Sequence, residues 1–216
     1  MSETILAADT ALGACSVVLL DGERILAHRF EVMERGHAEA LAPMVEDAMN
    51  AAGLSFAALD RLAVTTGPGT FTGQRVGLAF MRGLRVALGK PLIGVTTLSA
   101  MAHQAMAETG LGTAAALHDA RRDEVYLEIA GAVSTEPAIL PFEDAIAVLA
   151  RLSGKIALAG TAASAAQARL PHSVLSSVRQ PDAVWVARLA RTAPATDAPP
   201  KPLYLRPPDA KLPAQA

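Results

Sequence analysis

The order of strand-like and helix-like patterns constrains the fold of this chain more than any other feature of its sequence. Three short strand patterns come first, and the turn signal Asp21-Gly22 separates the second from the third. Apolar residues then recur at helical spacing from His37 to Ala52, and the strand pattern RLAVTT follows. Helix, strand and helix patterns complete the unit at about Glu108. This βββαβαβα order predicts a mixed sheet with helices on its faces.

The second half of the chain, from about residue 110, reads as a shortened copy of the first half. Its strand patterns TAAALHDA and DEVYLEIAG are followed by helix, strand, helix and helix patterns. Asp9 and Asp119 hold equivalent places, because each closes an apolar strand and precedes a short polar turn and a second strand. This similarity favours an internal duplication. We expect a first lobe over 1–109, a second, shorter lobe over 110–192, and a proline-rich extended tail over 193–216.

Composition and charge exclude several classes of protein. Hydrophobic residues make up 51% and charged residues 19% of the chain, and no apolar run approaches the roughly 20 residues of a membrane span. No charged leader precedes an apolar signal region, so we expect a cytoplasmic protein with no membrane contact. A formal net charge of -2 gives no basic face for an autonomous nucleic-acid binder, and any contact with RNA should therefore depend on a partner.

The stretch TTGPGTFTG, residues 65–73, is the clearest candidate for a ligand site. Its glycines would let a ligand approach the backbone closely, and the free amides at the following helix start favour an anion. The stretch lacks the Lys-Ser/Thr ending of a P-loop and the third glycine of a dinucleotide motif. Two interpretations stay open: a nucleotide contact, or a tight turn in which Thr70 or Thr72 caps the helix. The candidate nucleotide-binding residues are Asp9, Thr10, Gly67, Gly69, Thr70 and Gly73.

The sequence shows no complete catalytic apparatus. The five histidines are scattered, no pair has zinc-type spacing, and neither an H-E-x-x-H motif nor a G-x-S-x-G elbow is present. His37 is most simply a helix-start or surface residue. We therefore predict no catalytic residue and no tightly bound metal in this chain.

The predicted helix from Gly73 to Leu88 has an unusually broad apolar face. Its apolar residues cover an arc of about 140°, whereas packing on one sheet face usually needs about 100°. Part of this face is therefore available for another protein, and core packing alone is the competing interpretation. Arg75, Arg82 and Arg85 lie on the opposite side and should form the rim of a partner surface.

Most of the chain is covered by five segments that match one family: ILAADTALGACSVVLLDGERIL, RGHAEALAPMVEDAM, TTGPGTFTGQRVGLAFMRGL, ALHDARRDEVYLEIA and LYLR. These segments resemble the TsaB (YeaZ) family of bacterial tRNA threonylcarbamoyladenosine biosynthesis proteins, and GPGTFTGQRVGLAFMRGL is the most specific of them. The resemblance implies an α/β, actin-like and Hsp70-like ASKHA fold with two mixed-sheet lobes, of which the second is reduced. This fold agrees with the duplicated order of elements.

The resemblance also implies an accessory role in a complex. In the family, this subunit pairs with the catalytic paralogue TsaD and is joined by the ATPase TsaE, and it meets tRNA only through the complex. No cofactor is implied beyond weak binding of ATP or ADP. The paralogue carries a metal site on an H-x-x-x-H motif, whereas here His37 is followed four positions later by Leu41. The missing ligand favours a non-catalytic pseudo-enzyme that activates or scaffolds the complex.

The resemblance implies a partner surface on two predicted helices of the first lobe, His37 to Ala52 and Gly73 to Leu88. In the family, these helices bundle with the equivalent pair of the paralogue. The isolated chain is expected to be able to form an isologous homodimer through the same surface. The expected interface residues are Leu41, Met44, Val45, Met49, Val76, Gly77, Phe80, Met81 and Leu84. The rival interpretation is a stand-alone ASKHA kinase or acyl transferase that uses Asp9, Asp119 and the glycine-rich loop on ATP.

Overall fold

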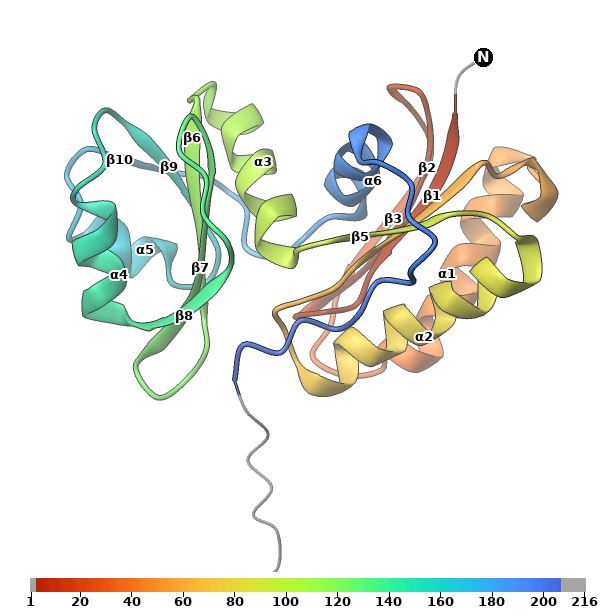
Figure 1. Ribbon diagram of the computed structural model, residues 1–216, viewed down its shortest axis with the longest axis horizontal. Helices are drawn as coiled ribbons and strands as arrows, with labels where there is room; N and C mark the ends of the chain where they lie inside the picture. Colours follow the sequence, from red (N-terminus) through yellow and green to blue (C-terminus); the bar gives the residue numbers. More distant parts are fainter. Residues whose placement is uncertain (1–2, 207–216) are drawn as a thin grey trace, which may run out of the picture.

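The computed structural model describes residues 3–206, so residues 1–2 of the predicted first lobe and 207–216 of the predicted tail lie outside the described residues. The first half forms a five-stranded sheet in the order β3-β2-β1-β4-β5 (Figure 1). Strands β1, β4 and β5 are parallel, and β2 is antiparallel to both of its neighbours, β1 and β3. Its elements are β1 (Thr4–Asp9), β2 (Ala14–Asp21), β3 (Arg24–Val32), α1 (His37–Ala52), the 3-10 turn η1 (Phe56–Ala58), β4 (Arg61–Thr65), α2 (Phe71–Leu88), β5 (Leu92–Val95) and α3 (Thr97–Thr109).

The second half repeats this arrangement in a second sheet, with the order β10-β9-β6-β7-β8. Strand β6 is antiparallel to β7 and parallel to β9, as β1 is to β2 and β4. The elements are β6 (Thr113–Asp119), β7 (Glu124–Gly131), β8 (Ala138–Pro141), α4 (Phe142–Leu149), β9 (Ile156–Ala159), α5 (Ala163–Gln167), β10 (Ser173–Leu175) and α6 (Ala183–Thr192). Read in chain order, both halves are βββαβαβα, which supports the predicted duplication.

Alternation along the strands places one core on each face of each sheet. On the first sheet, α1 and α2 cover the face formed by Leu6, Val17 and Leu62, whereas α6 covers the face formed by Ile5 and Val18 (Figure 1). On the second sheet, α4 and α5 cover one face and α3 covers the other. Within residues 3–206, no helix is long and apolar enough to cross a membrane.

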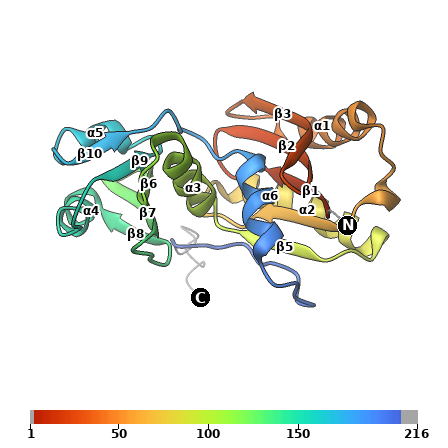
Figure 2. The ribbon, with the colours of Figure 1, turned by 90° about the horizontal axis from the view of Figure 1, so that it is seen from above.

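The last helix of each half packs on the sheet of the other half. Helix α3 buries Leu98 and Met101 against the second sheet, and α6 buries Val186 against the first. The two helices also contact each other between the sheets (Figure 2). Residues 109 and 192, the predicted boundaries, are the last residues of α3 and α6. By packing, however, α3 belongs to the second lobe and α6 to the first.

Local signals agree with most strands and helices but miss two strands. Thr70 caps α2, because its hydroxyl oxygen accepts a hydrogen bond from Gly73 N at 3.0 Å, and Thr72 lies inside the helix. Strands β8 and β10 were not predicted, because they have only four and three residues and complete their pairing at sheet edges.

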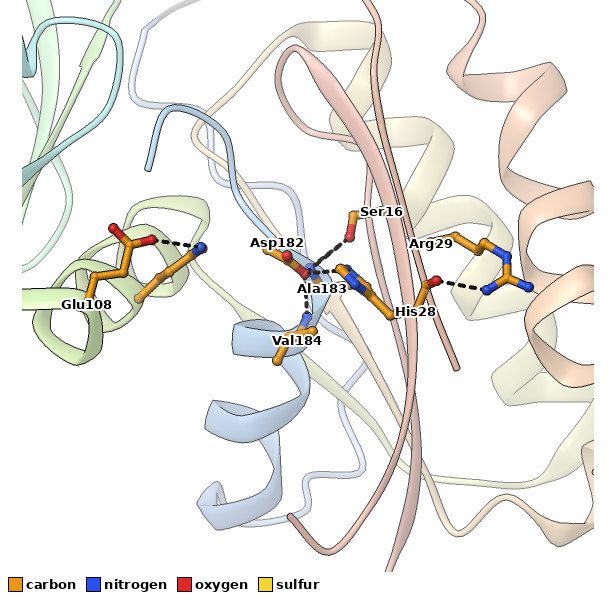
Figure 3. A network of polar contacts seen from close by, with 8 residues as sticks. Ser16, His28, Arg29, Glu108, Asp182, Ala183 and Val184 are labelled. Atoms are coloured by element: carbon orange, nitrogen blue, oxygen red, sulfur yellow. Dashed lines mark hydrogen bonds and ion pairs between the residues drawn. The ribbon is translucent and has the colours of Figure 1, made fainter. Parts of the chain in front are cut away.

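Asp182 holds α6 on the first sheet (Figure 3). Its Oδ1 atom accepts a hydrogen bond from Val184 N at 2.9 Å, which caps the helix, and lies 2.9 Å from His28 Nε2. Ser16 Oγ lies 3.4 Å from the same oxygen and accepts a hydrogen bond from Ala183 N at 3.0 Å. One carboxylate therefore joins the connection from the second lobe to strands β2 and β3.

Replacing Asp182 with Ala should lower the free energy of unfolding by about 2 kcal/mol, because the helix cap and the contact with His28 are lost together. Urea denaturation followed by circular dichroism measures this change. Asp197→Ala, at an exposed position of the C-terminal segment, is the matched control and should stay within about 0.5 kcal/mol of the wild type. Equal stability of the Asp182→Ala variant and the wild type would contradict this role.

Candidate functional site

The glycine-rich loop before α2 packs directly on the turn between β1 and β2. A Cβ atom on Gly69 would lie 2.3 Å from Ala11 O, and one on Gly73 would lie 2.2 Å from Thr10 O. Thr70 N donates a hydrogen bond to Ala11 O at 2.8 Å, and Thr10 Oγ1 donates one to Gly73 O at 2.7 Å. Glycine is therefore required at these two positions for a close approach of backbone to backbone.

Asp9 lies beneath this junction and is completely buried. Its Oδ1 atom accepts hydrogen bonds from Thr65 Oγ1 at 2.6 Å and from Ala11 N at 3.2 Å, whereas Oδ2 has no hydrogen-bond partner among the described residues. Burial raises the pKa of Asp9 to about 7, and the hydrogen bond from Thr65 and that from Ala11 oppose this rise. Asp9 is therefore a completely buried carboxyl group whose pKa lies well above its ordinary value of 3.8.

The structure thus brings the six candidate nucleotide-binding residues together in one packed junction. Thr10 is 1% exposed, and the side chain of Gln74 fills the space beside Gly67, where Gln74 Nε2 donates a hydrogen bond to Gly69 O at 3.0 Å. Gln74 was not singled out from the sequence, since a glutamine in the first turn of a helix is usually solvated. The tight-turn interpretation fits these contacts, and nucleotide binding by the junction stays a prediction.

His37 begins α1 and is buried, so the helix-start interpretation is correct and the surface interpretation is wrong. Its Nε2 atom donates a hydrogen bond to Leu12 O at 2.9 Å, which ties the helix start to the β1–β2 turn. Leu41, one turn later, is 1% exposed and packs in the core under the first sheet. Among residues 3–206, no group of three His, Cys, Asp or Glu side chains is arranged to hold a metal ion.

The predicted partner surface on α1 and α2 needs a correction. Five of its nine residues are buried inside the first lobe: Leu41, Val45, Met49, Gly77 and Met81. Met81 is 0% exposed, and a Cβ atom on Gly77 would lie 2.7 Å from Thr10 Oγ1, so Gly77 serves the approach of α2 to the β1–β2 turn. Helix α2 packs against both the sheet and α1, and this accounts for its broad apolar arc. The partly exposed members are Met44, Val76, Phe80 and Leu84.

The three arginines of α2 hold the C-terminal segment, rather than standing free as a rim. Arg85 Nη2 donates a hydrogen bond to Asp197 O at 2.6 Å, and Arg82 Nε donates one to Pro200 O at 3.1 Å. Arg75 Nε donates one to the Tyr204 hydroxyl at 2.8 Å. The segment after α6 therefore runs along the first lobe beside α2 (Figure 1).

Asp119 occupies the position in the second lobe that Asp9 occupies in the first, but its surroundings differ. It is exposed and accepts a hydrogen bond from Arg121 N at 2.8 Å. The following turn carries positive φ angles of 57° to 62° at residues 121–123, and an open cavity of about 590 Å³ lies beside it. Its lining includes Asp119, Asp123, Glu124, Phe142, Glu143 and Thr161. The sequence did not indicate this cavity, because its walls come from three separate connections.

Comparisons with known proteins agree with the family resemblance. The family model for TsaD, tRNA N6-adenosine threonylcarbamoyltransferase, matches residues 26–180. The tRNA threonylcarbamoyladenosine biosynthesis protein TsaB of Escherichia coli is 43% identical over 122 residues, which cover 56% of this chain and 52% of that protein. The matched region therefore spans about half the length of that curated relative.

Solved structures cover nearly the whole chain. YeaZ from Pseudomonas aeruginosa superimposes with a TM-score of 0.79 at 32% identity, over 94% of this chain and 100% of that one. The (R)-2-hydroxyglutaryl-CoA dehydratase component A of Acidaminococcus fermentans has a TM-score of 0.54 at 11% identity, over 87% of this chain and 97% of that one, and is similar in fold alone. The predicted actin-like ASKHA fold with two mixed sheets is confirmed.

The raised pKa of Asp9 makes the stability of the first lobe depend on pH. Between the ordinary value of 3.8 and about 7, the unfolded chain loses the Asp9 proton and the folded chain keeps it. The free energy of unfolding is therefore highest at low pH and falls as the pH rises from about 4 toward 7, by at most about 1.4 kcal/mol per pH unit. Asp9→Asn cannot ionise, so its unfolding free energy relative to the wild type should rise by about 2 kcal/mol from pH 5 to pH 7.

Urea denaturation of both proteins across this range measures the difference. Burial also raises the pKa of Glu128 to about 7 and lowers that of His118 to about 4, so the wild-type curve alone is not diagnostic. Both groups titrate equally in the two proteins and cancel in the comparison. A difference between Asp9→Asn and wild type that stays constant with pH would contradict the raised pKa.

Proposed function

Because the chain belongs to the TsaB (YeaZ) family, which takes part in tRNA threonylcarbamoyladenosine biosynthesis, we propose that it is a non-catalytic subunit that pairs with TsaD. One observation carries this proposal. The position that would supply the second histidine of the H-x-x-x-H motif is Leu41, buried in the core, and His37 is bonded to Leu12 O. These two side chains stabilise the lobe and offer no pair of ligands to a metal.

A helix face on the first lobe supports pairing with a second protein. Helices α1 and α2 lie side by side, on the sheet face opposite α6 (Figure 1). Met44, Val76, Phe80 and Leu84 are only partly buried between and beside them. Apolar side chains in this position would gain burial when a similar helix pair of the paralogue docks.

The other components belong to the same proposal. TsaE joins the pair, tRNA is reached through the complex, and the protein works in the cytoplasm without a cofactor of its own. Weak ATP or ADP binding arises only in the complex, and the isolated chain can pair with its own copy through the same helices. The rival, a stand-alone kinase or acyl transferase, is disfavoured because the side chains of Asp9 and Thr10 are buried and bonded within the protein.

An activity assay from which TsaD or this chain is omitted tests which subunit is catalytic. Threonylcarbamoyl transfer to tRNA should require TsaD, and adding this chain should raise the rate without giving product by itself. Consumption of ATP or formation of modified tRNA by the purified chain alone would overturn the non-catalytic assignment.

Placing a charge on the outer helix face should break the pair. Met44→Glu puts a carboxylate at a partly buried position of α1, where docking would leave it desolvated, and should weaken binding to TsaD about 100-fold. Gel filtration measures co-elution with TsaD, and circular dichroism confirms folding. Val148→Glu on α4, at a position 37% exposed in the second lobe, is the matched control and should bind normally. Wild-type affinity of folded Met44→Glu would place the interface elsewhere.

A further inference from the structure

Two aromatic rings that are far apart in the sequence are in contact on the protein surface at the start of α2. Phe71 and Tyr204 stack with their ring centroids 5.8 Å apart and their planes inclined by 27°. Arg75 Cζ lies 3.5 Å from the centroid of Phe71, and its Nε bonds the Tyr204 hydroxyl at 2.8 Å. We call these three residues the aromatic platform.

The platform is exposed and yet held in place. Phe71 is 57% exposed and Tyr204 43% exposed, and neither ring belongs to the four hydrophobic cores of residues 3–206. Phe71 is the first residue of α2, directly after its cap, and the residue before Tyr204 donates a hydrogen bond from Leu203 N to Thr66 O at 2.7 Å. Rings fixed by their neighbours and open to solvent are suited to binding, because little conformational freedom is lost when a ligand docks.

The surroundings of the platform are positively charged. Arg82 and Arg85 follow Arg75 along the same helix, and the hydrogen-bond partners of all three are a hydroxyl and backbone carbonyl oxygens, which are neutral. Within residues 3–206 no ion pair includes any of the three. Lys201 is exposed on the segment that they hold. A local cationic row therefore accompanies the rings, although the formal net charge of the whole chain is -2.

Exposed aromatic rings beside cations match one chemical class of ligand. Unpaired nucleobases stack on aromatic rings, and arginine and lysine attract the phosphates between them. A purely apolar protein surface would fit the rings but would supply no negative charge to the three guanidinium groups. An unpaired nucleotide segment satisfies both parts of the surface.

We propose that the aromatic platform stacks an unpaired base of an RNA strand, with its phosphates attracted by the arginine row of α2. The proposal rests on the proposed function. The chain as a whole has no basic face, so this contact with RNA is weak in the isolated chain and contributes mainly inside the complex. The C-terminal segment completes the site by supplying Tyr204, which gives that segment a role in binding.

Titration of a fluorescein-labelled, single-stranded oligoadenylate by fluorescence anisotropy tests the platform. The complex with TsaD and the isolated chain at low ionic strength are measured in parallel. The double variant Phe71→Leu/Tyr204→Leu keeps apolar bulk and should bind the oligonucleotide about tenfold more weakly, since stacking is lost. Phe30→Leu, at a ring 42% exposed on β3, is the matched control and should bind as the wild type does.

A second variant separates charge from stacking. Arg85→Gln removes a cation of the arginine row that bonds Asp197 O and neither of the two rings. It should lower the slope of log affinity against log salt concentration by about one, because one phosphate contact is lost. Circular dichroism confirms that each variant is folded. Equal affinities of the double variant and the wild type, or no binding of the oligonucleotide by the wild type in either setting, would overturn the platform.

Gel filtration with TsaD distinguishes this proposal from the proposed function. If the wild type fails to pair with TsaD but the isolated chain binds the oligonucleotide through Phe71 and Tyr204, the proposed function fails and the platform stands. If the double variant no longer pairs with TsaD but keeps its affinity for the oligonucleotide, the rings form a protein-docking surface, and the proposal that they stack a base is wrong.

Discussion

The contact between the glycine-rich loop and the β1–β2 turn is the constraint on which the first lobe depends. The carbonyl oxygens of Thr10 and Ala11 occupy the space that a side chain on Gly73 or Gly69 would need. This contact fixes the start of α2. It thereby places Met81 in the core and leaves Val76, Phe80 and Leu84 partly exposed. A loop with the composition of a phosphate cradle is thereby used for internal packing, and its amide at Thr70 bonds a backbone carbonyl.

The two halves of the chain show how one topology supports two different surfaces. Both sheets have the same strand order, and α3 and α6 are exchanged between them, so each half depends on the other for one of its cores. At the end of the first strand, Asp9 is buried in a closed junction, whereas Asp119 is exposed beside a cavity of about 590 Å³. Packing has closed the junction of the first lobe and left that of the second open.

Most of the fold was predictable from the sequence, because local periodicity and caps mark its strands and helices. The outward face of α2 was not, since an apolar arc does not tell whether the sheet, a neighbouring helix or a partner fills it, and Met81 proved to be core. Contacts between distant residues carry no local signal: Arg75 meets Tyr204 across 129 positions, and His28 meets Asp182 across 154. Of the candidate site, the sequence located the loop but not what its glycines contact.

The central claim is that the first lobe presents the outer face of α1 and α2 to a paralogue and performs no chemistry in its own loop junction. Hydrogen–deuterium exchange of the chain with and without TsaD tests this claim most directly, because it reports every segment that becomes protected. The account predicts slower exchange confined to α1, α2 and their adjoining turns. Unchanged exchange in both helices, with protection instead around the second-lobe cavity from Asp119 to Glu124, would contradict it.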